Sequence, residues 1–183
     1  MNRIMLIRHA EKPAADISGV SEHGNQDPDE LSVRGWQRAG ALVRYFAPFG
    51  GKFAHPTLAT PGLVFAAAPT DHAKSLRSKH TAKPLADFLQ TPLNLDHSKG
   101  DEKAVAKAAL SVAGPVLIAW EHRAIPEIAK HICNDSLPYP KQWPDERFDM
   151  VLVFDRSADN QPWTFTQIPQ LLLAGDSQTT FPL

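Results

Sequence analysis

The sequence predicts an α/β fold: a three-layer sandwich with a mostly parallel central sheet, helices on both faces and an antiparallel edge strand. Short apolar segments such as 63–67 and 116–120 alternate along the chain with segments of helical periodicity. These apolar segments lack polar alternation, which is typical of strands that helices cover on both faces. Two strand-like segments separated by a turn at 155–161 end the pattern and predict an antiparallel pair.

Length and composition restrict the class of protein. A chain of 183 residues can bury a substantial core, and we expect one domain spanning 1–183. The formal net charge is -1 and no long run of Lys or Arg occurs, which argues against a nucleic-acid partner. Cys133 is the single cysteine, so an intrachain disulfide is excluded. No apolar run approaches the ~20 residues of a membrane span, so we expect a cytoplasmic protein with no membrane partner.

The N-terminal region predicts a strand, a loop and a helix. The apolar segment 4–7 predicts a short buried strand. Residues 13–31 carry five acidic side chains and no Lys or Arg, which predicts a long loop lying over or beside the end of that strand. Ser32 predicts the N-cap of a helix that ends at Pro48. Trp36 lies on the apolar stripe of this helix, so we expect it in the core.

The middle region predicts a second strand and a second helix. The strand is expected at 63–67, and the helix after it has Leu76, His80 and Leu85 at periodic positions. Pro84 falls inside this periodic segment. Because proline removes a helical hydrogen bond, we expect a kink or a restart there.

The C-terminal half contains the segment that best predicts a strand, the continuously apolar 116–120, which we expect at the centre of the sheet. Asp101 predicts the cap of the helix before it, and Pro126 suits the first turn of the helix after it. The other expected elements are a short strand at 93–95, a helix end at Gly114-Pro115, a loop at 134–147, a strand at 150–154 and an edge strand at 163–168.

Ionisable residues follow three of the predicted strands. Arg8 and His9 end the first strand, the segment 71–77 with Arg77 follows the second, and His122 follows the central strand. Because the carboxyl ends of parallel strands meet at one edge of the sheet, we expect these residues in one pocket. Arginines suit a phosphoryl group, whose oxygens share negative charge, and an imidazole can attack phosphorus. The sequence therefore predicts a phosphoryl-transfer site.

The order of these motifs resembles the histidine phosphatase superfamily, also called phosphoglycerate-mutase-like. Arg8-His9-Ala10-Glu11 resembles its arginine-histidine-glycine signature, with Ala10 in place of the usual glycine. The helix start at 31–39, the run at 77–82 and the apolar strand 116–122 resemble three further motifs of the family in the right order. The resemblance covers most of the chain. Arg123 stands where one branch of the family carries an aspartate acid.

The resemblance implies a small phosphatase of the histidine acid phosphatase type rather than a mutase. Its substrate would be a small phosphorylated molecule or a phosphoprotein, and no metal or other cofactor is implied. By this resemblance His9 is the nucleophile that forms a phosphohistidine, Arg8 and Arg77 bind the phosphoryl oxygens, and His122 completes the charged pocket. Glu11 is a further candidate for the phosphate-binding set.

The proton donor to the leaving group is not marked by a motif. Glu102 lies at a family-like distance beyond Arg77 and is the first candidate. It is equally an acidic residue in the first turn of a helix, where the macrodipole favours it. Glu11, Asp71 and Glu121 are alternative donors.

Two other classes of function remain open from the sequence. A metal-dependent phosphoesterase would use His9 and Glu11 with Asp71 and His72 as ligands, although no compact cluster of ligands occurs. A phospho-ligand binding module on the same fold, without catalysis, is the second alternative.

Overall fold

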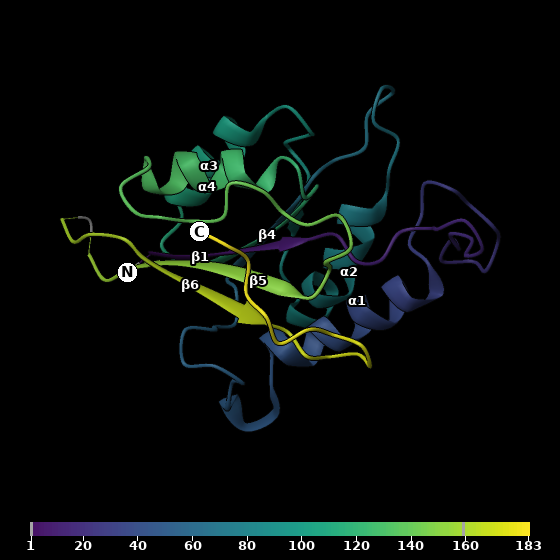
Figure 1. Cartoon of the computed structure of the whole chain (residues 1–183), viewed down its shortest axis with the longest axis horizontal. Coiled ribbons are helices and arrows are strands. Elements are labelled where there is room, and N and C mark those ends of the chain that lie inside the picture. The colour runs from purple at the N-terminus through teal and green to yellow at the C-terminus, as the bar shows by residue number, and fades with distance from the viewer. Residues whose placement is uncertain (1, 159) are drawn as a thin grey trace.

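The computed structural model describes residues 2–158 and 160–183, which form a mixed sheet of six strands in the order β3-β2-β4-β1-β5-β6 (Figure 1). β1, β2, β3 and β4 run parallel, whereas β5 runs antiparallel to both β1 and β6. The predicted fold class is confirmed, with β6 as the edge strand. The strands are β1 (Asn2–Arg8), β2 (Leu63–Ala66), β3 (Leu93–Asn94), β4 (Gly114–Trp120), β5 (Met150–Arg156) and β6 (Thr164–Pro169). The helices are α1 (Val33–Phe46), α2 (Arg77–Leu89), α3 (Glu102–Leu110) and α4 (Ile125–Cys133), with a 3₁₀ turn, η1 (Phe49–Gly51).

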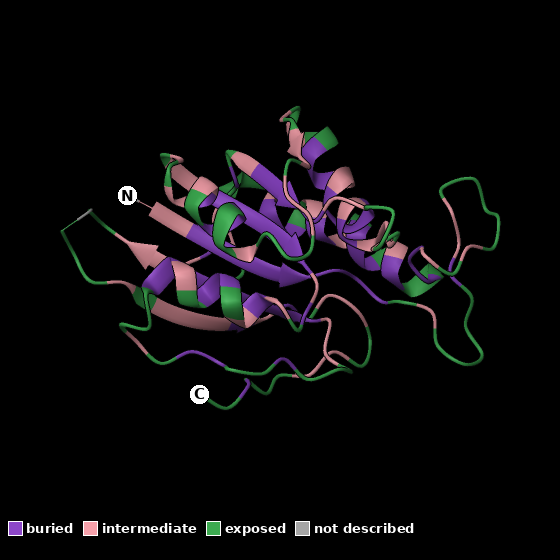
Figure 2. Ribbon diagram, turned by 90° about the horizontal axis from the view of Figure 1, so that it is seen from above, coloured by how far each residue is buried: buried purple, intermediate pink, exposed green. Residues whose placement is uncertain are grey.

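The sheet separates two apolar cores, because side chains alternate between its faces. In β1, Ile4 and Leu6 pack with α3 and α4, whereas Met5 and Ile7 pack with α1 and α2. The central strands are therefore buried on both faces, and the exposed residues lie in loops and on the outer sides of helices (Figure 2).

Two local details differ from the sequence-based expectations. Of the kink or restart expected at Pro84, the restart is wrong, because α2 continues through this residue as one helix. Asp101 precedes α3 as expected, but its side chain does not cap the helix. Its carboxylate accepts hydrogen bonds from the backbone N–H and hydroxyl of Ser98 instead. Ser32 does cap α1, because its Oγ accepts from the Gly35 N–H at 3.1 Å.

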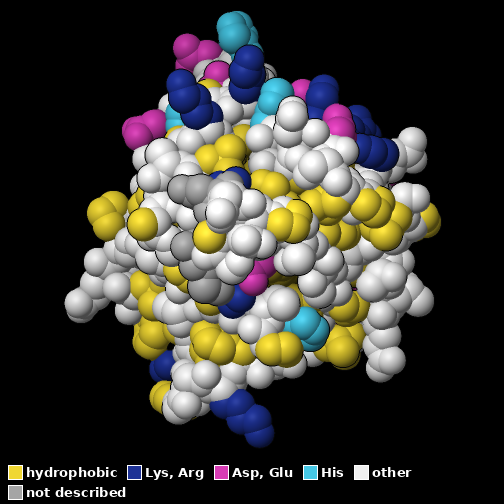
Figure 3. All heavy atoms as spheres, turned by 90° about the vertical axis from the view of Figure 1, so that its left-hand side faces the viewer, with side chains coloured by type: hydrophobic (Ala, Val, Ile, Leu, Met, Phe, Trp, Pro, Cys, Tyr) yellow, Lys and Arg dark blue, Asp and Glu magenta, His cyan; other side chains and the backbone are white. Residues whose placement is uncertain are grey.

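The carboxyl ends of β1, β2 and β4 lie at one edge of the sheet, and the loop of residues 13–31 extends from that edge (Figure 1). Figure 3 faces the opposite end of the molecule, where charged side chains gather along the upper margin, on the side of α3 and α4. Few charged side chains occupy the middle of that face. The ionisable residues predicted to act together thus belong to the other end of the sheet.

None of the helices in the described part of the chain combines the length and the apolar character that a membrane crossing requires.

Candidate active site

His9 continues the pairing of β1 with β4 and is held rigidly at the strand end. Its backbone N–H donates to the Trp120 carbonyl at 2.9 Å. Its ring is buried, and Nδ1 lies 2.7 Å from the Ala10 carbonyl oxygen. A carbonyl oxygen only accepts, so Nδ1 carries the proton in this arrangement and Nε2 keeps its lone pair.

The surroundings of His9 favour the uncharged imidazole. Burial, the positive charges of Arg8 and Arg77, and His122 together lower the pKa of His9 to about 3. The hydrogen bond to Ala10 opposes this effect only in part. At neutral pH the ring is therefore neutral, which a nucleophilic nitrogen requires.

The backbone after His9 is fixed by two helices. The Ala10 N–H donates to Thr81 Oγ1 at 2.8 Å, and this hydroxyl donates to the Arg77 carbonyl in α2. In α1, Gly35 lies so close to Glu11 that a Cβ at this position would collide with the Glu11 carbonyl oxygen. Thr81 and Gly35 belong to the two helical motifs that resemble the family, and their positions explain why those motifs accompany the strand-end signature.

Arg8 is buried and only partly satisfied by the protein. Its Nη1 donates to backbone carbonyls of the loop before β5, and its guanidinium lies 3.8 Å from the centre of the Phe148 ring. Its Nε and Nη2 are buried without a hydrogen-bond partner among the described residues. Burial lowers the pKa of Arg8 to about 10, so the group stays charged at neutral pH. Two donor nitrogens without a partner on a buried cation are suited to bind an oxyanion.

Arg77 begins α2 and lies beside His9 in the same cavity. Its Nε donates to the Glu30 carbonyl at 3.1 Å and its Nη2 to the Pro28 carbonyl. The acidic loop is also attached to α2 by a buried hydrogen bond between His80 Nδ1 and Glu30 Oε2, 2.7 Å long. The loop of residues 13–31 therefore lies beside the site and sets the direction of the Arg77 side chain.

His122 and Glu121 follow β4 and lie next to one another. The Nε2 atom of His122 is 2.5 Å from Asp145 Oδ1, while Nδ1 lies 2.9 Å from Glu121 Oε1 without forming a hydrogen bond. Glu121 Oε2 is buried, and Lys99 Nζ is 3.7 Å away, beyond hydrogen-bond distance. Burial and the charge of Arg8 lower the pKa of His122, whereas the hydrogen bond to Asp145 and the charge of Glu121 raise it.

A cavity of about 350 Å³ lies beside His9. His9, Arg77 and Glu121 line it, and small alanines lie among its polar lining residues. The other lining residues are Asp29, Ala67, Ala68, His72, Ala73, Lys74, Ser75, Ser78 and Lys99. Arg8 and His122 are close enough to influence the charge of His9. Four of the predicted site residues, Arg8, His9, Arg77 and His122, are thus brought together.

The remaining predicted residues lie elsewhere. Glu11 points away from this cavity, because its carboxylate binds Arg38 at 2.7 Å and Arg34 at 3.1 Å. Glu102 lines a neighbouring cavity and accepts hydrogen bonds from the Trp120 indole and the Gly100 N–H. Asp71 is exposed and does not line the cavity of His9.

Within residues 2–158 and 160–183, no group of three or more His, Cys, Asp or Glu side chains is arranged to hold a metal ion. In particular, the carboxylate of Glu11, one of the ligands considered for a metal-dependent enzyme, is taken up by two arginines.

Two charged residues with structural contacts lie outside the residues predicted from the sequence: one contacts the site, and one lies away from its cavity. Asp145 contacts His122 from a proline-rich loop whose sequence has no periodic pattern. Arg38, in α1, is buried between Glu11 and Asp176 of the C-terminal tail. The available signal for Arg38 was its position on the same helical face as Leu42. A buried arginine requires anionic partners, so this position indicates that acidic residues lie nearby.

Comparison of the sequence with protein-family models gives no match. Comparison with curated proteins gives no match either.

Solved structures do match. A protein histidine phosphatase, SixA, in complex with tungstate is 13% identical with a TM-score of 0.58, covering 92% of this chain and 97% of that chain. A mycobacterial glucosyl-3-phosphoglycerate phosphatase is 11% identical with a TM-score of 0.56, covering 91% of this chain and 97% of that chain. The ecdysone phosphate phosphatase of Bombyx mori, in complex with tungstate, is 12% identical with a TM-score of 0.57, covering 100% of this chain and 98% of that chain. The chain therefore has the fold of the histidine phosphatase, or phosphoglycerate-mutase-like, superfamily, as its strand-end motifs implied.

Proposed function

We propose that the protein is a phosphatase that hydrolyses a phosphomonoester or a phosphoprotein through a phosphohistidine on His9. One observation carries this proposal. A neutral imidazole with a free Nε2 lies beside a buried arginine, Arg8, whose Nε and Nη2 have no partner in the described chain. A nucleophile and an unsatisfied oxyanion site in the same position suit phosphoryl transfer.

The steps follow from this placement. Nε2 of His9 attacks phosphorus in line with the leaving oxygen, so the N–P bond forms as the P–O bond breaks. Arg8, Arg77 and His122 stabilise the charge on the three oxygens that stay with phosphorus. The leaving oxygen takes a proton from a general acid. A water molecule then attacks phosphorus as the N–P bond breaks, and the deprotonated general acid takes the proton that this water loses. Inorganic phosphate leaves, the general acid is protonated again, and the imidazole is neutral again.

Glu121 is our choice for the general acid. It lines the cavity of His9, and its buried Oε2 has no hydrogen-bond partner in the described chain. Glu102, the first candidate from the sequence, faces the adjoining cavity and is engaged by the Trp120 indole. Glu11 is engaged by arginines. Glu121 is therefore the carboxyl group best placed to reach a leaving oxygen.

The cavity beyond His9 supports a small, polar leaving group. Lys74, Ser75 and Lys99 line it, and its described lining residues include no Phe, Tyr, Trp or large aliphatic side chain. A pocket of about 350 Å³ lies near the lower end of small-molecule sites. We therefore expect faster turnover for phosphomonoesters of hydrophilic alcohols than for those of bulky apolar alcohols.

The test combines turnover with trapping of the intermediate. The protein is assayed in chelator on a panel of phosphomonoesters and on phosphohistidine, and rapidly quenched samples are searched by mass spectrometry for a phosphoryl group on His9. His9→Ala should abolish both signals, because removing a nucleophile costs orders of magnitude in rate. His55→Ala, in the loop before β2, is the matched control and should keep both.

Two results would contradict the proposal. Binding of inorganic phosphate without turnover of any substrate would indicate a phospho-ligand binding module. Turnover that chelator removes and a divalent metal restores would indicate a metal-dependent phosphoesterase.

A further inference from the structure

The loop between α4 and β5 contributes to the site through its backbone. Arg8 Nη1 donates to the carbonyl oxygens of Pro144 at 3.4 Å, Asp145 at 2.5 Å and Arg147 at 3.0 Å. One nitrogen of Arg8 thus binds the loop, while Nε and Nη2 stay unsatisfied. The loop is therefore part of the structure that holds Arg8 in place.

The same loop reaches His122 through a side chain. Asp145 Oδ1 lies 2.5 Å from His122 Nε2, and Asp145 Oδ2 lies 3.7 Å from Arg123. The hydrogen bond to His122 lowers the pKa of Asp145, so the group is a carboxylate at neutral pH. A carboxylate only accepts hydrogen bonds, so Nε2 of His122 carries a proton. The other nitrogen, Nδ1, is the buried atom without a hydrogen-bond partner, on the side of Glu121.

We propose that Asp145 is a positioning residue for the reaction: its carboxylate fixes the His122 ring through Nε2, so that Nδ1 is presented to the transferred phosphoryl group. This inference rests on the proposed phosphatase function. Carboxylate–imidazole pairs set both the tautomer and the orientation of a histidine, and such partners matter although they do not touch the substrate.

The alternative is that Asp145 blocks the site as an internal anion. A blocking carboxylate would occupy the unsatisfied donors of the oxyanion site. The Nε and Nη2 atoms of Arg8 have no partner in the described chain, and the Asp145 carboxylate contacts Nε2 of His122 instead. The geometry thus favours support of His122 over inhibition.

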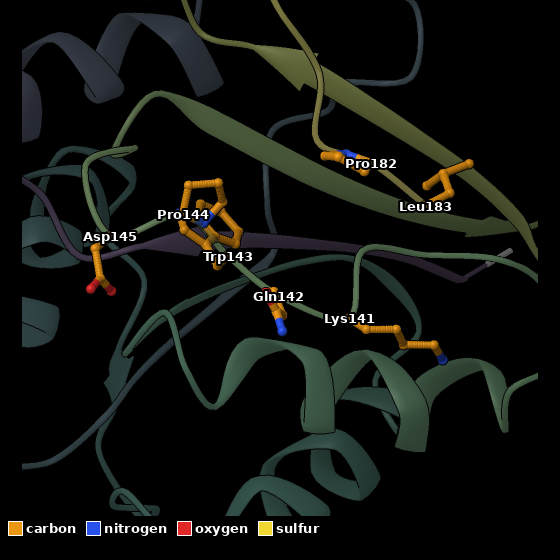
Figure 4. A pocket seen from close by; sticks show the side chains of 7 residues that line it. All are labelled: Lys141, Gln142, Trp143, Pro144, Asp145, Pro182 and Leu183. Atoms are coloured by element: carbon orange, nitrogen blue, oxygen red, sulfur yellow. The ribbon is translucent and has the colours of Figure 1, made fainter.

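The loop is held in place independently of any substrate. The Trp143 indole donates to the Arg147 carbonyl at 2.8 Å, and Phe181 of the C-terminal tail packs on Trp143 with ring centres 5.0 Å apart. Arg147 also donates to the Thr179 carbonyl. Between loop and tail lies a groove of about 640 Å³, with Asp145 at one end and Lys141 at the other (Figure 4). Contacts with the C-terminal tail thus hold the loop that carries Asp145.

The charges around His122 predict a measurable effect. Arg8 from the end of β1 disfavours the protonated ring, while Glu121 from β4 and Asp145 from the loop favour it. His9 is neutral above about pH 3. Removing the Asp145 carboxylate therefore lowers the pKa of His122 and reduces the fraction of His122 able to donate from Nδ1.

The experiment compares wild type with Asp145→Asn, which keeps the size of an exposed side chain and removes its charge. Ring ¹⁵N NMR of His122 across a pH series reports its tautomer and pKa, and pH–rate profiles are measured on one substrate. We expect a lower pKa for His122, a basic limb moved to lower pH, and a loss in kcat/KM of about tenfold or more. Glu146→Gln removes the neighbouring charge and is the matched control.

Either of two results would overturn the proposal. Identical His122 titrations in wild type and Asp145→Asn would show that Asp145 does not govern this ring. Faster turnover of Asp145→Asn would show that Asp145 blocks the site. If the phosphatase assignment is wrong, wild type turns over no substrate. The NMR titration needs no turnover, so it still shows whether Asp145 governs His122, and the two failures can be told apart.

Discussion

Replacing His9 by alanine should change how the stability of the protein depends on pH. The pKa of His9 is about 3 in the folded protein, against 6.5 for an unperturbed histidine. Between these values the unfolded chain binds a proton that the folded protein does not, so the free energy of unfolding falls as pH falls. Above pH 6.5 the stabilisation that comes from the uncharged His9 is fully present, and below about pH 3 it is fully lost.

The size of the effect follows from the two pKa values. A single group with this shift lowers the free energy of unfolding by about 2 kcal/mol between about pH 8 and about pH 5. The full shift corresponds to a loss of about 5 kcal/mol once both states are protonated. His122, whose pKa is also lowered, adds a contribution of the same sign. The difference between wild type and His9→Ala isolates the share of His9.

Urea unfolding at a series of pH values measures this difference. At about pH 8 the two proteins differ only by the pH-independent cost of truncating a buried ring, which serves as the internal reference. Toward about pH 5 wild type should lose about 2 kcal/mol more than His9→Ala. Parallel curves for the two proteins would refute the inference that burial keeps His9 uncharged, and with it the assignment of a neutral nucleophile.

Three further outcomes are expected. Arg77→Ala should weaken inhibition by inorganic phosphate severalfold or more, and an unchanged inhibition constant would place Arg77 outside the phosphate site. Glu121→Gln should slow alkyl phosphates far more than p-nitrophenyl phosphate, because nitrophenolate leaves without a proton. If Glu102→Gln shows this dependence on the leaving group and Glu121→Gln does not, Glu102 is the proton donor. Gly35→Ala should lower the urea midpoint, because its Cβ meets backbone, whereas Gly40→Ala, with open space around it, should keep or raise it.

Most of the fold was predictable because strands buried on both faces have a distinct sequence pattern. The segments 4–7, 63–67, 116–120 and 150–154 are continuously apolar, and each lies in a strand or at its end in the structure. The restart considered at Pro84 was wrong, since a helix tolerates the loss of one hydrogen bond when its buried face is well packed.

The candidate site was predictable where it depends on strand ends and not where it depends on distant segments. Arg8, His9 and His122 follow apolar runs, and the topology of a parallel sheet brings such residues together. Asp145 meets His122 only through the path of an irregular loop, which no periodicity describes. The sequence offered Glu121 as an alternative proton donor to Glu102. Choosing between them required knowing which residues line each of two adjacent cavities.

The central place of β1 in the sheet has a consequence for folding. Asn2 is opposite Gly114 on one side and opposite Arg156 on the other. The first strand therefore completes its pairing only after most of the chain has been synthesised. Contacts between residues so far apart in sequence make folding slow, because the entropy of closing long loops is lost before the contacts form. During synthesis the segment that carries Arg8 and His9 is made before β4 and β5, and it reaches its final surroundings only after both of these strands have formed.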